Sequence, residues 1–179
     1  MKFDDVINTR KSIRKYLPKK VDKDTINALL ESALLAPTWK NTQTGRYYVI
    51  MEADLLASIK EDCLPDFNQR NCENVPVLII TTYITDESGF VDGVACDKLG
   101  NGWGIYDLAM QNENLLLKAA DLGLGTLVMG LYDDAKLHAY IPSISDKECI
   151  VSVIAVGYPD EDQPERPSRK SVAEIATYL

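Results

Sequence analysis

The sequence of 179 residues contains a single histidine, His138, and no Cys-x-x-Cys pair. One histidine excludes a histidine-ligated metal cluster, and the scattered cysteines do not replace it. These cysteines are Cys63, Cys72, Cys96 and Cys149. A serine hydrolase would need His138 as its base, and no Gly-x-Ser-x-Gly turn is present. The chain therefore lacks reactive groups of its own, and a phosphorylated cofactor would account for that lack.

Long apolar runs are also absent. The longest, residues 149–156, is interrupted by Ser152 and is too short to cross a bilayer. No apolar stretch follows the first charged residues, Lys2 and Asp4, so we expect no secretory signal. Cysteines without close partners suit a reducing compartment. We therefore expect a soluble, cytoplasmic protein without a membrane partner, in which residues 1–179 form one domain.

Positive charge is scarce but concentrated. Asp and Glu outnumber Lys and Arg by 27 to 19, which disfavours nucleic acid as a partner. Residues 6–20 nevertheless contain no acidic residue and six cations, namely Arg10, Lys11, Arg14, Lys15, Lys19 and Lys20. Such a local cluster favours a compact anion such as phosphate, although a solvated basic arm is the alternative. Arg166, Arg169 and Lys170 could join the cluster if the fold brings the two ends together.

Capping residues and apolar spacing predict helices and strands that alternate along the chain. Helices are expected over 22–36, 53–60 and 105–122, after Asp133 and after Ser171, and strands over 47–51, 77–83, 126–129 and 149–156. This order favours a sheet covered by helices, but it does not give the order of the strands. The glycine-rich stretch 85–104 is a candidate lid or inserted loop.

Three short motifs carry candidate binding groups. Alternation in an extended segment would let Arg10, Ser12 and Arg14 face one ligand while Ile13 faces the core. Residues 36–43 form a polar loop whose amides could bind a heteroaromatic edge and whose tryptophan could stack. The alternative is an ordinary helix-to-strand loop, since a tryptophan is more often part of the core than a ligand platform. Residues 123–130 close a helix before a strand, the reverse of the dinucleotide-binding order. The glycine at 130 could instead let backbone N–H groups approach a ligand.

Taken in order, these motifs resemble the nitroreductase family of FMN-dependent oxidoreductases. Residues 10–14 are similar to the family's Arg-Arg-Ser-x-Arg signature, and residues 36–43 to its Ala-Pro-Ser-x-x-Asn-x-Gln loop. Residues 122–126 read Leu-Gly-Leu-Gly-Thr, as in the family, and residues 157–159 read Gly-Tyr-Pro. The departures are Thr38 in place of serine, Thr44-Gly45 in place of Pro-Trp, and Asn71 where some relatives have a lysine. These differences leave the substrate preference open.

The resemblance implies an α+β fold, a three-layer α/β/α sandwich with a central, mostly antiparallel mixed sheet, in an intertwined homodimer that holds two FMN molecules at its interface. The helix over 105–122 would form much of that interface. The resemblance also implies which residues bind the cofactor. They are Arg10, Lys11, Ser12, Arg14, Asn68, Met129, Gly130, Arg169 and Lys170 of one subunit, with Pro37, Thr38, Trp39 and Asn41 of the other. No side chain need be catalytic, since Arg14 and the Gly130 amide would only tune the flavin.

The activity that the resemblance implies is ping-pong transfer of a hydride from NADH or NADPH, through FMN, to an electron-poor acceptor such as a nitroaromatic. Reduction of enones, quinones or free flavin and reductive dehalogenation remain alternatives. A non-enzymatic FMN-binding or storage protein is another, as is a basic-arm binding module without a cofactor. The physiological acceptor and the choice between NADH and NADPH are not readable from the sequence.

Overall fold

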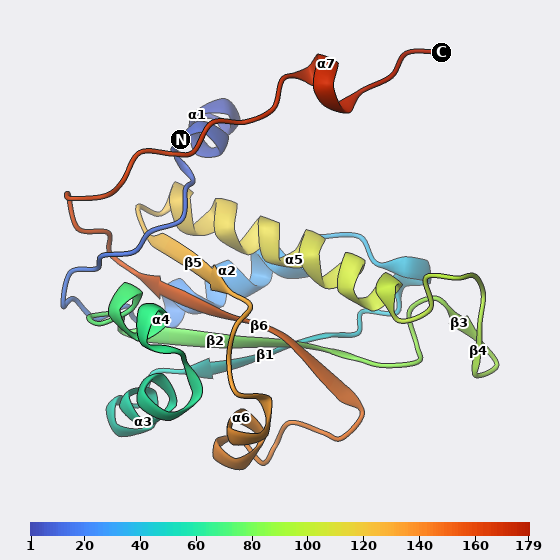
Figure 1. Cartoon of the computed structure of the whole chain (residues 1–179), viewed down its shortest axis with the longest axis horizontal. Coiled ribbons are helices and arrows are strands. Elements are labelled where there is room, and N and C mark those ends of the chain that lie inside the picture. The colour runs from blue at the N-terminus through green and yellow to red at the C-terminus, as the bar shows by residue number, and fades with distance from the viewer.

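The computed structural model describes all 179 residues and is centred on a four-stranded sheet (Figure 1). Its strands are β1 (Gly45–Ile50), β2 (Val77–Ile84), β5 (Gly125–Met129) and β6 (Glu148–Gly157). They lie in the order β1-β2-β6-β5, and every neighbouring pair is antiparallel. A parallel bridge between Ser12 and Thr126 adds the N-terminal segment to β5. The sheet is therefore mixed and mostly antiparallel, as the resemblance implied.

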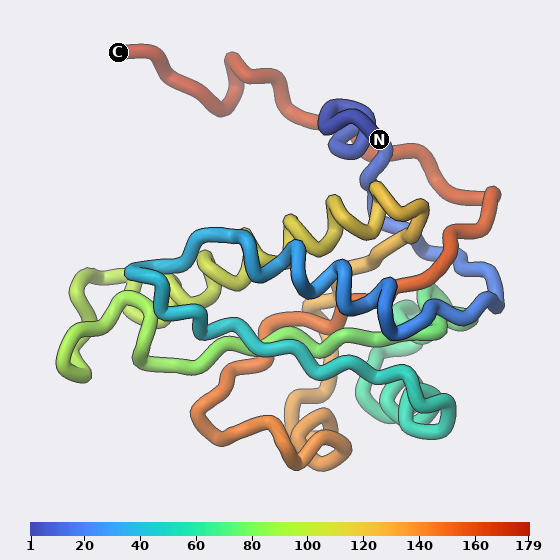
Figure 2. Tube along the Cα trace, turned by 180° about the vertical axis from the view of Figure 1, so that it is seen from behind, coloured from blue at the N-terminus to red at the C-terminus, as the bar shows by residue number.

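Helices cover both faces of this sheet, which gives the expected three layers (Figures 1 and 2). One face packs against α2 (Lys23–Leu34) and α5 (Gly102–Asp121). The other face packs against α3 (Ala53–Cys63) and α6 (Asp134–Tyr140), and α4 (Asp66–Asn71) lies on the same side next to α3. None of the helices combines the length and the apolar character that crossing a membrane requires.

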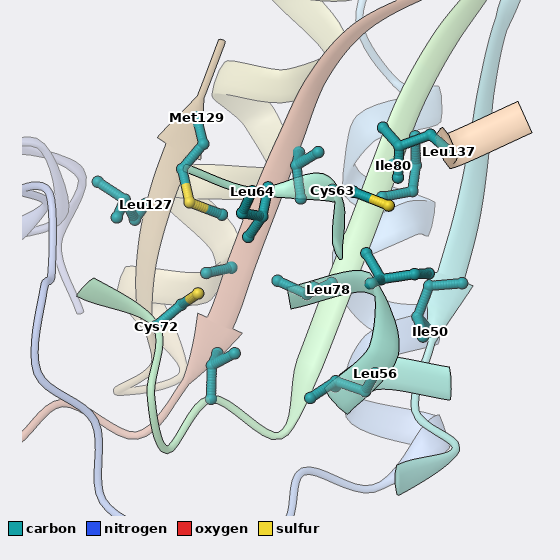
Figure 3. Close-up of a cluster of buried hydrophobic side chains, with 14 of the residues drawn as sticks. Ile50, Leu56, Cys63, Leu64, Cys72, Leu78, Ile80, Leu127, Met129 and Leu137 are labelled. Atoms are coloured by element: carbon teal, nitrogen blue, oxygen red, sulfur yellow. The ribbon is translucent and has the colours of Figure 1, made fainter. Parts of the chain in front are cut away.

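The alternation of side chains along β2 supplies both cores. Leu78 and Ile80 face the core beneath α3 and α6 (Figure 3), while Val77 and Ile79 face the core beneath α2 and α5. Successive strand residues point to opposite faces, so a strand buried on both faces must be apolar throughout. Residues 77–80 meet this requirement, and Thr81 and Thr82, also buried, direct their hydroxyls to Ser152 and Glu148.

Side-chain caps explain where the predicted helices begin. Asp22 accepts a hydrogen bond from Thr25 N (2.7 Å), and Glu52 accepts from Asp54 N and Leu55 N (3.0 and 2.7 Å). Asp133 caps α6 in the same way, and a capping box starts α7 (Val172–Ile175). These acceptors satisfy N–H groups that have no partner within the first turn.

Two helices are not predicted from the sequence, α1 (Phe3–Thr9) and α4. Both are short and neither has a side-chain cap. The candidate lid is a folded hairpin of β3 (Phe90–Val91) and β4 (Val94–Ala95) rather than an irregular loop. Asp86 and Asn101 fasten its base by two hydrogen bonds of 2.7 and 2.9 Å.

Candidate functional site

The basic segment that begins at Arg10 runs as an extended chain beside β5. Ser12 forms the bridge to Thr126, and Ile13 N donates to Thr126 O at 2.9 Å. Ile13 is only 6% exposed and belongs to the core, whereas Ser12 and Arg14 are exposed. The predicted alternation of this segment is therefore present, and its polar side chains face solvent.

Gly125 permits this close packing of the segment on β5. A Cβ at position 125 would lie 2.5 Å from Ile13 Cγ1 and 2.9 Å from Ile13 Cβ. Contacts this short are not tolerated between carbon atoms, so a side chain here would push Ile13 and its neighbours away from the strand. The Leu-Gly-Leu-Gly-Thr motif thus sets the position of the basic segment.

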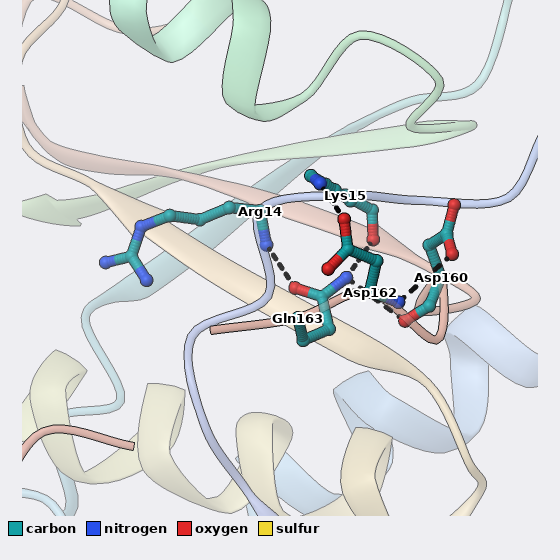
Figure 4. Close-up of polar contacts among 5 residues, drawn as sticks. All are labelled: Arg14, Lys15, Asp160, Asp162 and Gln163. Carbon is teal, nitrogen blue, oxygen red and sulfur yellow. Dashed lines mark hydrogen bonds and ion pairs between the residues drawn. The ribbon is translucent and has the colours of Figure 1, made fainter. Parts of the chain in front are cut away.

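The cations of the segment differ in how far they are neutralised. Lys15 pairs with Asp162, and this hydrogen bond raises the pKa of Lys15 and lowers that of Asp162. Arg10 Nε lies 3.8 Å from Glu113 Oε1. Arg14 has no acidic partner, and Figure 4 shows its guanidinium directed away from the cluster of Lys15, Asp160, Asp162 and Gln163. Arg14 is therefore available to a ligand.

Gln163 connects two segments of the chain by hydrogen bonds, a role that the sequence did not indicate. Its Oε1 accepts from Arg14 N at 3.0 Å, and its Nε2 donates to Lys15 O and Asp160 O (2.5 and 3.2 Å; Figure 4). One amide thus ties the basic segment to the chain that follows β6. It fixes the backbone of Arg14, while the guanidinium makes only one long bond, from Nη1 to Ser12 O at 3.5 Å.

The far end of β5 is open. Met129 is buried, but Gly130 is exposed, and a Cβ built on Gly130 meets no atom within 4 Å. The N–H groups of Gly130 and Leu131 donate to no group of this chain. A flat ligand could therefore approach this backbone closely and accept a hydrogen bond from it.

Asn68 lies beside that strand end and is 5% exposed. Its Nδ2 donates to Leu131 O at 3.2 Å, so the amide nitrogen fixes the segment after Gly130. The amide oxygen of Asn68 and the second N–H of its Nδ2 are left for a cofactor. Hollows of about 560 and 350 Å³ lie at the two ends of α4, one lined by Leu131 and the other by Arg14.

The second predicted motif lies at the other end of the molecule. Residues 36–43 include the short helix η1 (Trp39–Asn41) and lie next to the N-terminal half of α5, where Trp39 N donates to Asp107. Figures 1 and 2 both show this loop near the β3–β4 hairpin and far from α1. Pro37 and Asn41 are exposed, and Thr38 and Trp39 are half-buried. One chain therefore does not bring this loop to the basic segment.

The C-terminal cations are divided by the fold. Arg166 donates from Nη2 to Ile7 O (2.7 Å) and to Arg10 O, so the two ends of the chain do meet. Arg169 and Lys170 lie farther along a tail that passes α1 and leaves the body of the molecule (Figure 1). Within the chain, the Arg169 side chain donates one hydrogen bond, from Nη1 to Pro167 O at 3.1 Å. Both cations are fully available to another group.

The sequence of the chain is similar to that of known proteins. The sequence profile of the nitroreductase family matches residues 7–77 and 67–158. A relative from Methanothermobacter thermautotrophicus, provisionally named NADH dehydrogenase/NAD(P)H nitroreductase, is 28% identical over 171 residues, which cover 90% of this chain and 80% of the relative.

Solved structures share the fold. The nitroreductase family protein from Streptococcus pneumoniae has a TM-score of 0.83 at 21% identity and covers 99% of this chain and 100% of its own. A nitroreductase from Bacteroides fragilis, solved with bound FMN, has a TM-score of 0.76 at 20% identity, with full coverage of both chains.

Proposed function

The chain belongs to the nitroreductase family and is a nitroreductase-type oxidoreductase, and from this premise we propose that it is an FMN-dependent enzyme. It takes a hydride from NADH or NADPH and delivers it to an electron-poor acceptor such as a nitroaromatic. The relatives named as NAD(P)H nitroreductases and the FMN-bound neighbour support this proposal.

The observation that carries the proposal is the pairing of two features along β5. The basic segment meets the strand at Thr126, and open backbone with free N–H groups follows Met129. At a rise of about 3.3 Å per strand residue, Thr126 and Gly130 are about 13 Å apart. An elongated ligand with an anion at one end and a flat heteroaromatic ring at the other, such as FMN, matches this layout.

The residues present fit FMN in their chemistry. Arg10, Lys11, Arg169 and Lys170 would hold the phosphate, Ser12 the ribityl chain, and Arg14 the pyrimidine edge. Met129 and Gly130 would present backbone to the ring, and Asn68 would keep that backbone in place. When bound, FMN would supply the hydride-transfer chemistry that no side chain of this protein offers.

The chain's own residues would then act by charge and position. Arg14, without an acidic partner, would stabilise negative charge that develops at the pyrimidine edge. The Gly130 N–H would orient the ring edge at which hydride is exchanged. Neither group needs to gain or lose a proton for this role.

A second copy of the chain would complete each site. Pro37, Thr38, Trp39 and Asn41 lie at the end of α5 opposite the basic segment, so they would serve the partner's cofactor. Exposed apolar side chains point to the same assembly. They are Ile105 and Tyr106 on α5, and Val172, Ile175 and Tyr178 on the tail. We therefore propose a homodimer with two shared sites, each chain contributing residues 1–179 as one FMN-binding unit.

The proposal is tested by reconstituting the purified protein with FMN and adding NADH, and separately NADPH, without oxygen. Loss of the yellow absorbance, followed by its return when a nitroaromatic is added, is the expected result. Bound FMN that neither nicotinamide bleaches would indicate a storage protein instead. A colourless protein that refuses FMN would overturn the proposal altogether.

A further inference from the structure

We propose that Asp107, together with Ser88, is a positioning group that holds the Trp39 loop, residues 38–44, in the form in which it contacts the cofactor of the partner subunit. The inference rests on the proposed function for the role of the loop, but not for the contacts themselves. Asp107 lies on α5, remote in sequence from the loop, and no motif marks it.

Asp107 joins three parts of the fold. It is 1% exposed, and both of its carboxylate oxygens accept from Trp39 N at 3.0 Å. One of them also accepts from Ser88 Oγ at 2.7 Å, and Ser88 stands just before the β3–β4 hairpin. The Thr42 hydroxyl lies 2.6 Å from that of Ser88. A single carboxylate therefore fastens both the Trp39 loop and the base of the hairpin to α5.

The loop needs this support because its backbone is strained. Lys40, Asn41 and Gln43 have φ of 45°, 59° and 52°, a region that residues with a Cβ seldom adopt. Such conformations persist only where surrounding contacts determine them, and they are concentrated at functional sites. Further bonds within the loop are those of Gln43 N to Thr38 Oγ1 (3.1 Å) and Thr42 Oγ1 to Trp39 O (2.9 Å).

The character of Asp107 also argues for a role beyond packing. No lysine or arginine pairs with it, so its burial is compensated only by N–H and O–H donors. An apolar residue at a buried position would cost less free energy than a carboxylate without a cation. What the carboxylate adds is the fixed position of Trp39 and Ser88. Thr38, Trp39 and Asn41 are thereby presented on one rigid support.

The test compares Asp107→Ala, Asp107→Asn and Ser88→Ala with the unchanged protein. An asparagine at 107 can accept from Trp39 N–H and donate to Ser88 Oγ, so Asp107→Asn should keep the loop in place. Asp107→Ala leaves Trp39 N–H without its acceptor and should weaken FMN affinity about tenfold. Ser88→Ala keeps the bond between Asp107 and Trp39 N, so it should weaken FMN affinity less than Asp107→Ala does. It provides the test if Asp107→Ala does not fold.

Glu148→Ala is the matched control. Glu148 is also a carboxylate with several donors, since it accepts from Tyr48 Oη (2.9 and 3.0 Å) and from Thr82 Oγ1. Unlike Asp107, it connects the strands β1, β2 and β6 and does not contact the Trp39 loop. Its loss should lower the melting temperature without changing FMN affinity. If Asp107→Ala weakens FMN binding no more than Glu148→Ala does, Asp107 is merely structural and the inference fails.

Hydrogen exchange of the FMN-free protein separates this inference from the proposed function. Asp107→Ala should accelerate exchange in residues 38–44 and 86–91 together and leave β2 and β6 unchanged. Exchange that rises equally throughout the chain, or only in one of the two segments, would overturn the positioning role. If the unchanged protein refuses FMN, the proposed function and the cofactor role of the loop both fail, while the exchange result still decides whether Asp107 holds the loop.

Discussion

At the scale of single residues, local patterns can be predicted from the sequence, but contacts between residues far apart in the sequence cannot. The alternation of Ser12, Ile13 and Arg14 depends only on extended backbone, so it is predictable, and the structure places Ile13 in the core. Asp107 and Ser88 give no such signal. Asp107 lies 68 residues from Trp39, and Ser88 lies 46 residues from Thr42. Only the folded chain brings these groups together.

Arg14 provides the first prediction at this scale. Arg14→Ala should retain some FMN, because the phosphate contacts remain, but NADH should reduce the bound cofactor more slowly. The reason is the loss of positive charge beside the developing negative charge. Anaerobic stopped-flow absorbance measures this rate. The control is Lys15→Ala, which removes a cation already paired with Asp162. Unchanged reduction kinetics in Arg14→Ala would exclude the proposed role.

Gly125, in β5, and Gly130, directly after it, should respond differently to substitution by alanine. Gly130→Ala meets no atom within 4 Å and should leave the melting temperature unchanged while weakening FMN affinity, since the ligand approaches there. In Gly125→Ala the new Cβ would lie 2.5 Å from Ile13 Cγ1, so this variant should lose about 1–3 kcal/mol of folding stability. Thermal unfolding and FMN titration of both variants measure the difference. Equal FMN affinity in Gly130→Ala and the unchanged protein would argue against close approach at that backbone.

The buried thiols should be inert. Burial, assisted by the charge of Asp62, raises the pKa of Cys63 to about 11, and burial raises that of Cys72 to about 11 as well. The thiolate is the reactive form, so iodoacetamide at neutral pH should spare both residues in the folded protein and label them after unfolding. Peptide mass spectrometry reads this out. Rapid labelling of Cys63 in the native state would contradict its placement.

At the scale of elements, helix starts are predictable where a side chain caps them. Asp22, Glu52, Asp133 and Ser171 each mark a helix that the structure contains. The uncapped α1 and α4 give no comparable signal, and α4 is held in place by tertiary contacts such as that of Asn68. The difference follows from where the N–H groups of the first turn find their acceptors.

The carboxylate caps predict how stability depends on pH. Hydrogen bonds from backbone N–H groups lower the pKa of Asp22 and of Glu52 below their ordinary values of 3.8 and 4.5. A lowered folded pKa contributes stability that is complete above the ordinary value and is lost as the pH falls through the folded pKa. The melting temperature should therefore decline on acidification below pH 4.5. In the double variant Asp22→Asn/Glu52→Gln, the melting temperature should fall less steeply with decreasing pH. The same pH dependence in both proteins would exclude these caps as the cause of the decline.

At the scale of the whole molecule, the residues predict a sheet covered by helices, and the family resemblance adds the three layers. The strand order was not predictable, because it depends on pairings such as Val77 with Val156, far apart in sequence. The separation of the Trp39 loop from α1 and the basic segment that follows it is also a property of the complete fold, as the two views in Figures 1 and 2 show. This separation is what makes a second copy necessary for the proposed site.

The tail supplies a prediction at this scale. Truncation after Pro167 keeps the Arg166 contacts with Ile7 and Arg10, so the sheet and both cores should persist. It removes Arg169, Lys170 and the exposed apolar residues around α7, so the dimer should weaken and FMN affinity should fall. Analytical ultracentrifugation and FMN titration measure the two effects. The double variant Arg169→Ala/Lys170→Ala should lower FMN affinity alone, and a fully dimeric truncated protein would contradict the role of the tail.

The position of β6 bears on how the protein is made. It is the last strand in the chain, yet it lies between β2 and β5. During translation, the edge of β2 that pairs with β6 therefore stays unpaired until residues 148–156 have been made, and residues 77–83 of β2 are wholly buried in the finished protein. Unpaired apolar edges are the segments through which nascent chains associate. Interrupted synthesis should thus produce fragments that depend on chaperones, whatever the stability of the completed enzyme.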